Sequence, residues 1–133
     1  YIVDGEEKTT NFFMEMEPVN SFSSRKNNKP SKHFLVCAED CAVTVSTNSL
    51  EAEMCRLIPR LESIIRDAVE KETGKMQEEM ANFITTSPED RYTQLMNEKP
   101  ELLNRVPQHQ IASYLGVKPE TLSRIRKRLL TAK

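Results

Sequence analysis

The sequence predicts an α+β fold: short strands at the N-terminal end, then one long helix, then two short helices joined by a tight turn. Three observations predict it. Residues 1–46 hold short apolar runs, rich in β-branched and aromatic side chains, between turn signals. Residues 60–85 contain no proline and repeat apolar residues at intervals of three and four. Residues 106–130 hold two short helical patterns on either side of Gly116.

Four strands are expected before residue 47, at residues 1–3, 9–14, 34–37 and 42–46, with a turn at Asp4-Gly5. The polar stretch 20–32 is expected to be a loop. Four strands alone would leave open edges and a thin core. The chain also lacks an initiator methionine and starts in what resembles the middle of a strand. We therefore expect that the N-terminal part of this β domain is missing, or that its strands pair with something else.

Helical signals begin at Asn48, which is expected to cap a helix over residues 49–57 with Glu51 three residues on. Pro59 suits the start of a second helix that runs to about Thr85. A helix of about 27 residues spans about 40 Å, too long for a domain of this size to cover. Its apolar stripe is therefore expected to pack against a second copy of the chain; packing on the β domain is the alternative. The expected dimer interface consists of Leu61, Ile65, Ala68, Met76, Met80 and Phe83.

The next helix is expected to start at Ser87-Pro88, because the serine hydroxyl caps it and proline suits its first turn. Tyr92, Leu95 and Met96 form its apolar side, and Pro100 ends it. Residues 85–87 are the expected hinge before this C-terminal module.

Two short helices follow. Ile111, Ala112 and Leu115 lie on one side of the first, and Gly116 stands where a C-terminal glycine belongs. Pro119 suits the first turn of the second helix. Leu122, Ile125 and Leu129 recur on its buried side, a spacing typical of a helix-turn-helix.

The opposite face of this second helix is polar and cationic. Residues 101–133 carry seven Lys and Arg against two Asp and Glu, although the whole chain has a net charge of −1. Such a face fits DNA, whose phosphates attract cations and whose base edges bind Arg, Glu and hydroxyl groups. An ordinary helical hairpin with a solvated charged face is the alternative. The expected base contacts are Glu120, Thr121, Ser123 and Arg124, and the expected phosphate contacts are Gln108, His109, Lys127 and Arg128.

Residues 110–128, Gln-Ile-Ala-Ser-Tyr-Leu-Gly-Val-Lys-Pro-Glu-Thr-Leu-Ser-Arg-Ile-Arg-Lys-Arg, closely resemble the helix-turn-helix of the Crp/Fnr superfamily of bacterial transcription regulators. Ser87-Pro-Glu-Asp-Arg-Tyr and Pro100-Glu-Leu-Leu-Asn-Arg-Val-Pro resemble the lead-in of that family. The resemblance implies three domains: a partial cyclic-nucleotide-binding-like β-roll at 1–58, a dimerisation helix at 59–86 and a DNA-binding domain at 87–133.

The resemblance also implies a function. The family regulates transcription in the cytoplasm as homodimers, with a recognition helix, here residues 119–130, in the major groove of double-stranded DNA at an inverted repeat. RNA polymerase and a small-molecule effector are then candidate further partners.

Three departures from the family narrow these expectations. Residues 21–32 lack the Gly-Glu and Arg-Ala pairs that hold a cyclic nucleotide, so the effector is unknown and is not expected to be cAMP. Arg25, Lys26, Lys29 and Lys32 either attract another anion or form a solvated basic loop. Lys118 stands where the family often has a capping hydroxyl, and the β-hairpin wing of many members is expected to be absent or truncated here.

Other functional classes find little support. The chain contains no nucleophile–base constellation, metal motif, Gly-rich phosphate loop, signal peptide or membrane-length apolar run, so neither an enzyme, a cofactor nor a membrane partner is expected. Cys37, Cys41 and Cys55 are expected to be buried or half-buried structural thiols rather than ligands of a metal or iron–sulfur cluster. The remaining alternative function is a helix-turn-helix scaffold that binds protein.

Overall fold

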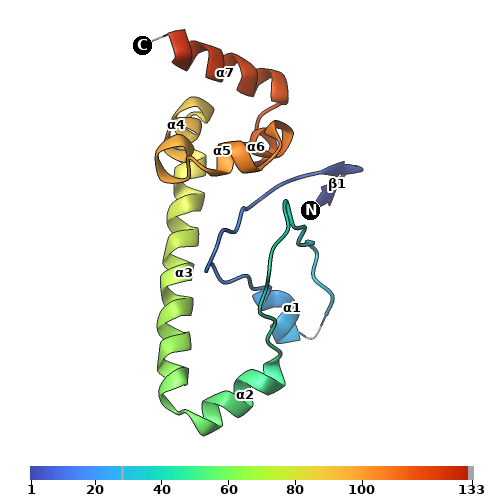
Figure 1. Ribbon diagram of the computed structural model, residues 1–133, viewed down its shortest axis with the longest axis vertical. Coiled ribbons are helices and arrows are strands. Elements are labelled where there is room, and N and C mark those ends of the chain that lie inside the picture. The colour runs from blue at the N-terminus through green and yellow to red at the C-terminus, as the bar shows by residue number, and fades with distance from the viewer. Residues whose placement is uncertain (28, 132–133) are drawn as a thin grey trace. The chain divides into compact units, whose positions relative to one another are not determined.

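The computed structural model describes residues 1–27 and 29–131 and divides the chain into two compact units (Figure 1). The first unit joins Tyr1–Asp40 to the residues from Ser87 onward. The second unit is Cys41–Thr86. The expected DNA-binding helices therefore fold together with the N-terminal segment, although some fifty residues of sequence separate them.

The N-terminal segment begins with a short hairpin. Strands β1 (Ile2–Val3) and β2 (Glu6–Glu7) are antiparallel, with Ile2 opposite Glu7 and Val3 opposite Glu6. Asp4 and Gly5 both have positive φ, 53° and 79°, as a two-residue type I′ turn requires. The turn predicted at Asp4-Gly5 is confirmed, but the second strand is Glu6–Glu7 and not residues 9–14.

The predicted α+β fold with a partial β-roll is wrong. The two-stranded hairpin is the only sheet in the described residues, and helices form most of the remaining regular structure. Residues 9–14, 34–37 and 42–46 are not strands, and Val36 and Val43 are 81% and 74% exposed. Strand propensity measures how well a side chain fits a pleated, half-buried surface. Without a neighbouring strand and a covering layer, these apolar runs have no such surface to occupy.

The predicted loop at residues 20–32 is interrupted by a helix, α1 (Phe22–Asn27). The loop prediction is wrong for these six residues. Asn28 and the side chain of Arg25 lie outside the described part of the chain.

The second unit contains two helices. Helix α2 (Asn48–Leu57) starts one residue earlier than predicted, because the Thr47 hydroxyl caps it by accepting a hydrogen bond of 3.2 Å from the Leu50 N–H. Helix α3 (Arg60–Thr85) has 26 residues, with Pro59 at its N-cap position. None of its side chains is fully buried within the single chain.

The first unit contains the C-terminal helices α4 (Pro88–Glu98), α5 (Leu102–Arg105), α6 (Gln108–Tyr114) and α7 (Pro119–Thr131). Ser87 begins α4 as predicted: its hydroxyl accepts from the Asp90 N–H, and the Asp90 carboxylate accepts from the Ser87 N–H.

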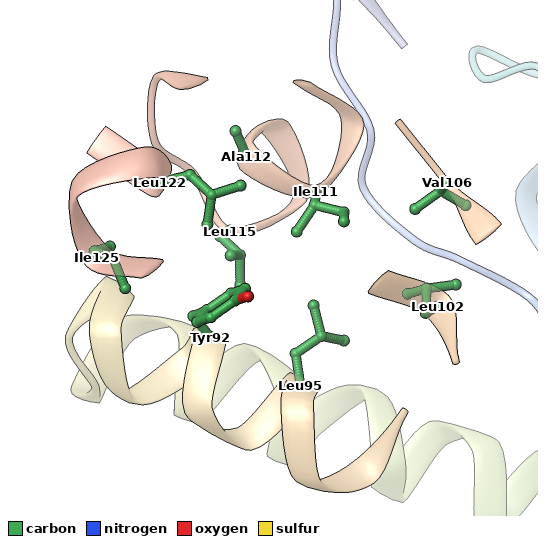
Figure 2. Close-up of a cluster of buried hydrophobic side chains, with 9 residues drawn as sticks. All are labelled: Tyr92, Leu95, Leu102, Val106, Ile111, Ala112, Leu115, Leu122 and Ile125. Atoms are coloured by element: carbon green, nitrogen blue, oxygen red, sulfur yellow. The ribbon is translucent and has the colours of Figure 1, made fainter. Parts of the chain in front are cut away.

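These helices surround one apolar core (Figure 2). Its buried side chains are Tyr92, Leu95, Leu102, Val106, Ile111, Ala112, Leu115, Leu122 and Ile125. Leu129 is half-buried against this core. Met96 is 40% exposed, so its predicted place on the apolar side of α4 is wrong; it follows Leu95 directly and is rotated about 100° from it around the helix.

The turn between α6 and α7 depends on Gly116. Its φ of 73° lies in the left-handed region, which costs glycine little. The Val117 N–H donates to the Ala112 carbonyl at 2.9 Å, and the Gly116 N–H donates to the Ser113 carbonyl at 3.0 Å. These two bonds form a Schellman motif, which satisfies the carbonyls at the end of α6 and directs the chain into α7.

Candidate nucleic-acid interface

Helix α7 has one buried and one exposed face. Leu122 and Ile125 are 1% and 2% exposed and anchor the helix on the core. Glu120, Ser123, Arg124 and Lys127 are exposed on the remaining surface, while Thr121 is half-buried. The four predicted base-contacting residues therefore lie on a helix whose rotation about its own axis is set by packing.

An open, shallow depression runs along α7. Its walls combine two hydroxyl groups with three cationic side chains: Thr121, Arg124, Lys127, Arg128 and Thr131. The cations suit a phosphate-bearing ligand, because they bind phosphate oxygens. The Thr131 hydroxyl already donates to the Lys127 and Arg128 carbonyls. This depression brings together two predicted base contacts and two predicted phosphate contacts.

Arg128 is already engaged in an ion pair. One of its terminal nitrogens lies 2.6 Å from a carboxylate oxygen of Glu89, in the first turn of α4. The Arg128 side chain is 65% exposed, so the pair is accessible to water and contributes little to stability. A phosphate at this position would share Arg128 with Glu89 or displace it.

Gln108 and His109 begin α6 and are both exposed. The residue before them, Pro107, is at the N-cap position and provides no side-chain cap. The first N–H groups of α6 must therefore be satisfied by other groups. The depression along α7 does not include either residue.

Arg91 orients the turn between α6 and α7. Its Nη2 atom donates a hydrogen bond of 2.9 Å to the Leu115 carbonyl at the end of α6. Arg91 is half-buried and comes from α4, 24 residues earlier in the sequence. The sequence pattern did not single it out, because nothing in the local sequence indicates a partner so far along the chain.

A segment from the N-terminal part of the chain, residues 9–17, packs on this module; we call it the strap. The Thr9 N–H donates to the Ser113 hydroxyl on α6 at 2.9 Å. The Phe12 ring packs against the Tyr114 ring, with centroids 5.2 Å apart and planes inclined by 60°. A tilted arrangement at this distance is favourable for two aromatic rings.

Two ion pairs complete the attachment of the strap. Lys99 lies 3.2 Å from Glu17, with both side chains about three-quarters buried. Arg105 donates through Nη1 and Nη2 to the two oxygens of Glu15, at 3.1 and 2.6 Å, and through Nε to Glu39 at 2.8 Å. The hydrogen bonds that Arg105 donates lower the pKa of the Glu15 carboxyl, and donating to Glu15 and Glu39 raises the pKa of Arg105.

The predicted dimer-interface residues all lie on α3. Leu61 and Ile65 are half-buried, whereas Ala68 is exposed and Met76, Met80 and Phe83 are 56%, 66% and 48% exposed. Exposing several large apolar side chains along one helix is unfavourable in water unless another surface covers them.

Other candidate sites are sparse in the described residues. Cys37 and Cys41 are exposed, so their prediction as buried or half-buried thiols is wrong; they lie in extended segments that no layer covers. Cys55 is half-buried. No cluster of three His, Cys, Asp or Glu side chains in residues 1–27 and 29–131 is placed to hold a metal ion. In the same residues, no helix has the length and apolarity needed to cross a membrane.

No protein-family model, curated protein or solved structure matches this chain.

Proposed function

We propose that this chain is a sequence-specific, DNA-binding transcription regulator of the Crp/Fnr type. The observation that carries the proposal is the cationic outer face of α7, held outward by the buried Leu122 and Ile125 and preceded by the Gly116 turn. A helix of this kind fits the major groove of B-DNA, where its side chains meet base edges.

Each predicted contact residue has a role in this proposal. Arg124 donates to a guanine, Glu120 accepts from a cytosine amino group, and Thr121 and Ser123 contact bases or phosphates. Lys127 contacts the phosphate backbone. Arg128 also contacts it, while its guanidinium is shared between the phosphate and Glu89. Gln108 and His109 contact phosphates from the start of α6, which is exposed.

The proposed assembly is a homodimer formed through α3. Two copies would cover the stripe that one chain leaves exposed and would place two α7 helices on an inverted repeat. Such a regulator works in the bacterial cytoplasm, with RNA polymerase and a small-molecule effector as candidate partners. We do not expect cAMP to be that effector, because residues 21–32 lack the pairs that hold a cyclic nucleotide.

The test is a selection of binding sequences from a random duplex library by the wild type, Arg124→Ala and Lys127→Ala. Arg124→Ala should weaken binding to the selected site by about 1–3 kcal/mol and relax the preference at one base pair in each half-site. Lys127→Ala should weaken all sequences alike, because a phosphate contact carries no sequence information. Equal sequence preferences for the wild type and Arg124→Ala would refute base reading by this residue.

Salt dependence separates DNA binding from the alternative of a protein-binding scaffold. The affinity of a DNA-binding module falls steeply as salt rises, because each neutralised phosphate releases condensed counterions. An apolar contact with a protein partner lacks this dependence. Absence of duplex binding at low salt would leave the scaffold as the better description.

A further inference from the structure

We propose that the strap is an inhibitory latch, which holds the acidic N-terminal hairpin against the helix-turn-helix and weakens DNA binding until its ion pairs open. This inference rests on the proposed function. It assigns regulation of that DNA interface to a segment outside the recognition helix. It is carried by the contacts between residues 1–40 and α4–α7, all within one compact unit.

Besides the contact between the Phe12 and Tyr114 rings, three polar contacts attach the latch. Thr9 bonds to Ser113 on α6, Glu15 pairs with Arg105 at the end of α5, and Glu17 pairs with Lys99 at the end of α4. A further carboxylate, Glu39, binds the same guanidinium as Glu15. Arg105 thus joins two separate N-terminal segments to the module.

The hairpin held by this strap is negatively charged. Residues 1–8 contain Asp4, Glu6 and Glu7 against Lys8 alone. The bond from Thr9 to Ser113 attaches the segment that follows the hairpin to the last turn of α6. Lys8 has the main effect in lowering the pKa of Glu6, and Lys118, the residue directly before α7, adds to it. Glu6 is thus near enough to Lys118 to interact with it, although its ion partner is Lys8 at 2.6 Å. In the proposed latch, the hairpin carboxylates oppose phosphate binding beside Lys118.

The attachment is suited to release. The strap has no fully buried residue, and its most enclosed side chains are only half-buried. The Arg105 side chain is 32% exposed, and those of Glu15 and Glu39 are 68% and 46% exposed. These Arg105 pairs are weak because water reaches them, whereas the Lys99–Glu17 pair is more enclosed. Segments with few buried contacts open locally at low cost. The nine buried residues of the core all come from residues 92–125, and the strap adds to them only the half-buried Phe12.

The decisive variant is Arg105→Gln, because two explanations predict opposite results. If Arg105 only adds positive charge to a DNA-binding module, removing it weakens DNA binding. If Arg105 closes the latch, removing it frees the hairpin and strengthens binding, by roughly five-fold or more, the lower end of ordinary couplings between sites. The full chain is titrated with a fluorescent duplex of random sequence, so that no knowledge of the operator is needed.

Three further variants keep the test decisive. Arg56→Gln, on α2, removes one cation without touching the strap and should not strengthen binding. Glu15→Gln combined with Glu39→Gln opens the latch from its other side, and Asp40→Asn combined with Glu101→Gln removes the same charge as a control. Tighter binding by the first pair and not by the second supports the latch, even if Arg105→Gln fails to fold.

Hydrogen exchange of the Thr9 amide reports on the latch without DNA. Its protection should fall in Arg105→Gln and persist in Arg56→Gln. Two outcomes overturn the latch. Either the wild type binds the duplex and Arg105→Gln binds it no more tightly, or the exchange of the Thr9 amide is unchanged in Arg105→Gln. If Thr9 is released but no form of the protein binds DNA, the proposed function itself fails and the inhibitory role with it.

Discussion

At the scale of single residues, Arg105 links the ionisation of Glu15 to the attachment of the strap. Its fork binds both oxygens of Glu15, and this hydrogen bonding lowers the pKa of Glu15 below its ordinary value of 4.5. A carboxylate with a depressed pKa in the folded state contributes stability above the unfolded value, and this contribution is lost as pH falls through the folded value. The strap should therefore be equally well attached at pH 7 and pH 6 and loosen only in acid.

This pH dependence can be measured at the Thr9 amide. Its protection factor, corrected for the intrinsic pH dependence of exchange, should be constant above about pH 5. It should decrease once the pH is lowered past the ordinary pKa of a carboxyl group. Glu15→Gln should remove most of this fall, because it removes the carboxyl whose pKa Arg105 lowers. A fall of the same size in wild type and Glu15→Gln would show that Glu15 does not hold the strap.

At the scale of helices and turns, we expect substitution by alanine to change stability in opposite directions at two glycines. Gly116 has a φ of 73° at the end of α6, whereas Gly74 lies inside α3, where an alanine methyl group would meet no other part of the chain within 4 Å. Gly116→Ala should destabilise the protein by about 1–2 kcal/mol, because an L-residue is strained in the left-handed region. Gly74→Ala should stabilise α3 by about 0.5–1 kcal/mol, because alanine is the better helix former.

Denaturant unfolding followed by circular dichroism measures both changes, and the identical substitution makes each variant the control for the other. A neutral Gly116→Ala would mean that the turn can adopt another conformation. A destabilising Gly74→Ala would mean that another surface approaches α3 on that side. Gly74 lies on the far side of the helix from Met76 and Phe83, so the proposed dimer does not predict such an approach.

At the scale of the whole molecule, the proposal requires that α3 bring two recognition modules together. Half-sites one helical turn apart require the modules to lie about 34 Å apart. Met80, on the α3 stripe, is 66% exposed in the single chain. Met80→Asp would bury an unpaired charge in the seam, at a cost of several kcal/mol. We expect a folded monomer that has lost affinity for an inverted repeat, although α7 is unchanged.

Light scattering and a DNA shift assay test this expectation together. Ala81→Asp is the matched control, because it introduces the same charge one position along α3, on an exposed site away from the stripe. It should leave dimerisation and binding intact. If Met80→Asp remains dimeric and binds normally, α3 is not the dimer interface.

The sequence determined the features of this protein that depend on neighbours in the chain. The Ser87 cap, Pro59 and Pro119 at helix starts, and Gly116 in the turn were all predictable, because caps, proline and glycine act within one helical turn. The buried faces of α6 and α7 were predictable for a related reason, since helical spacing alone places Ile111, Leu122 and Ile125 on the core side.

Only the tertiary structure decided the features that depend on distant partners. The predicted strands at residues 34–37 and 42–46 did not form, because a strand needs a neighbour that its own sequence does not specify. The strap was equally invisible: Arg105 meets Glu15 across 90 residues and Lys99 meets Glu17 across 82. Many acidic residues in the chain suit a cation equally well, and folding alone selects which of them comes within hydrogen-bonding distance.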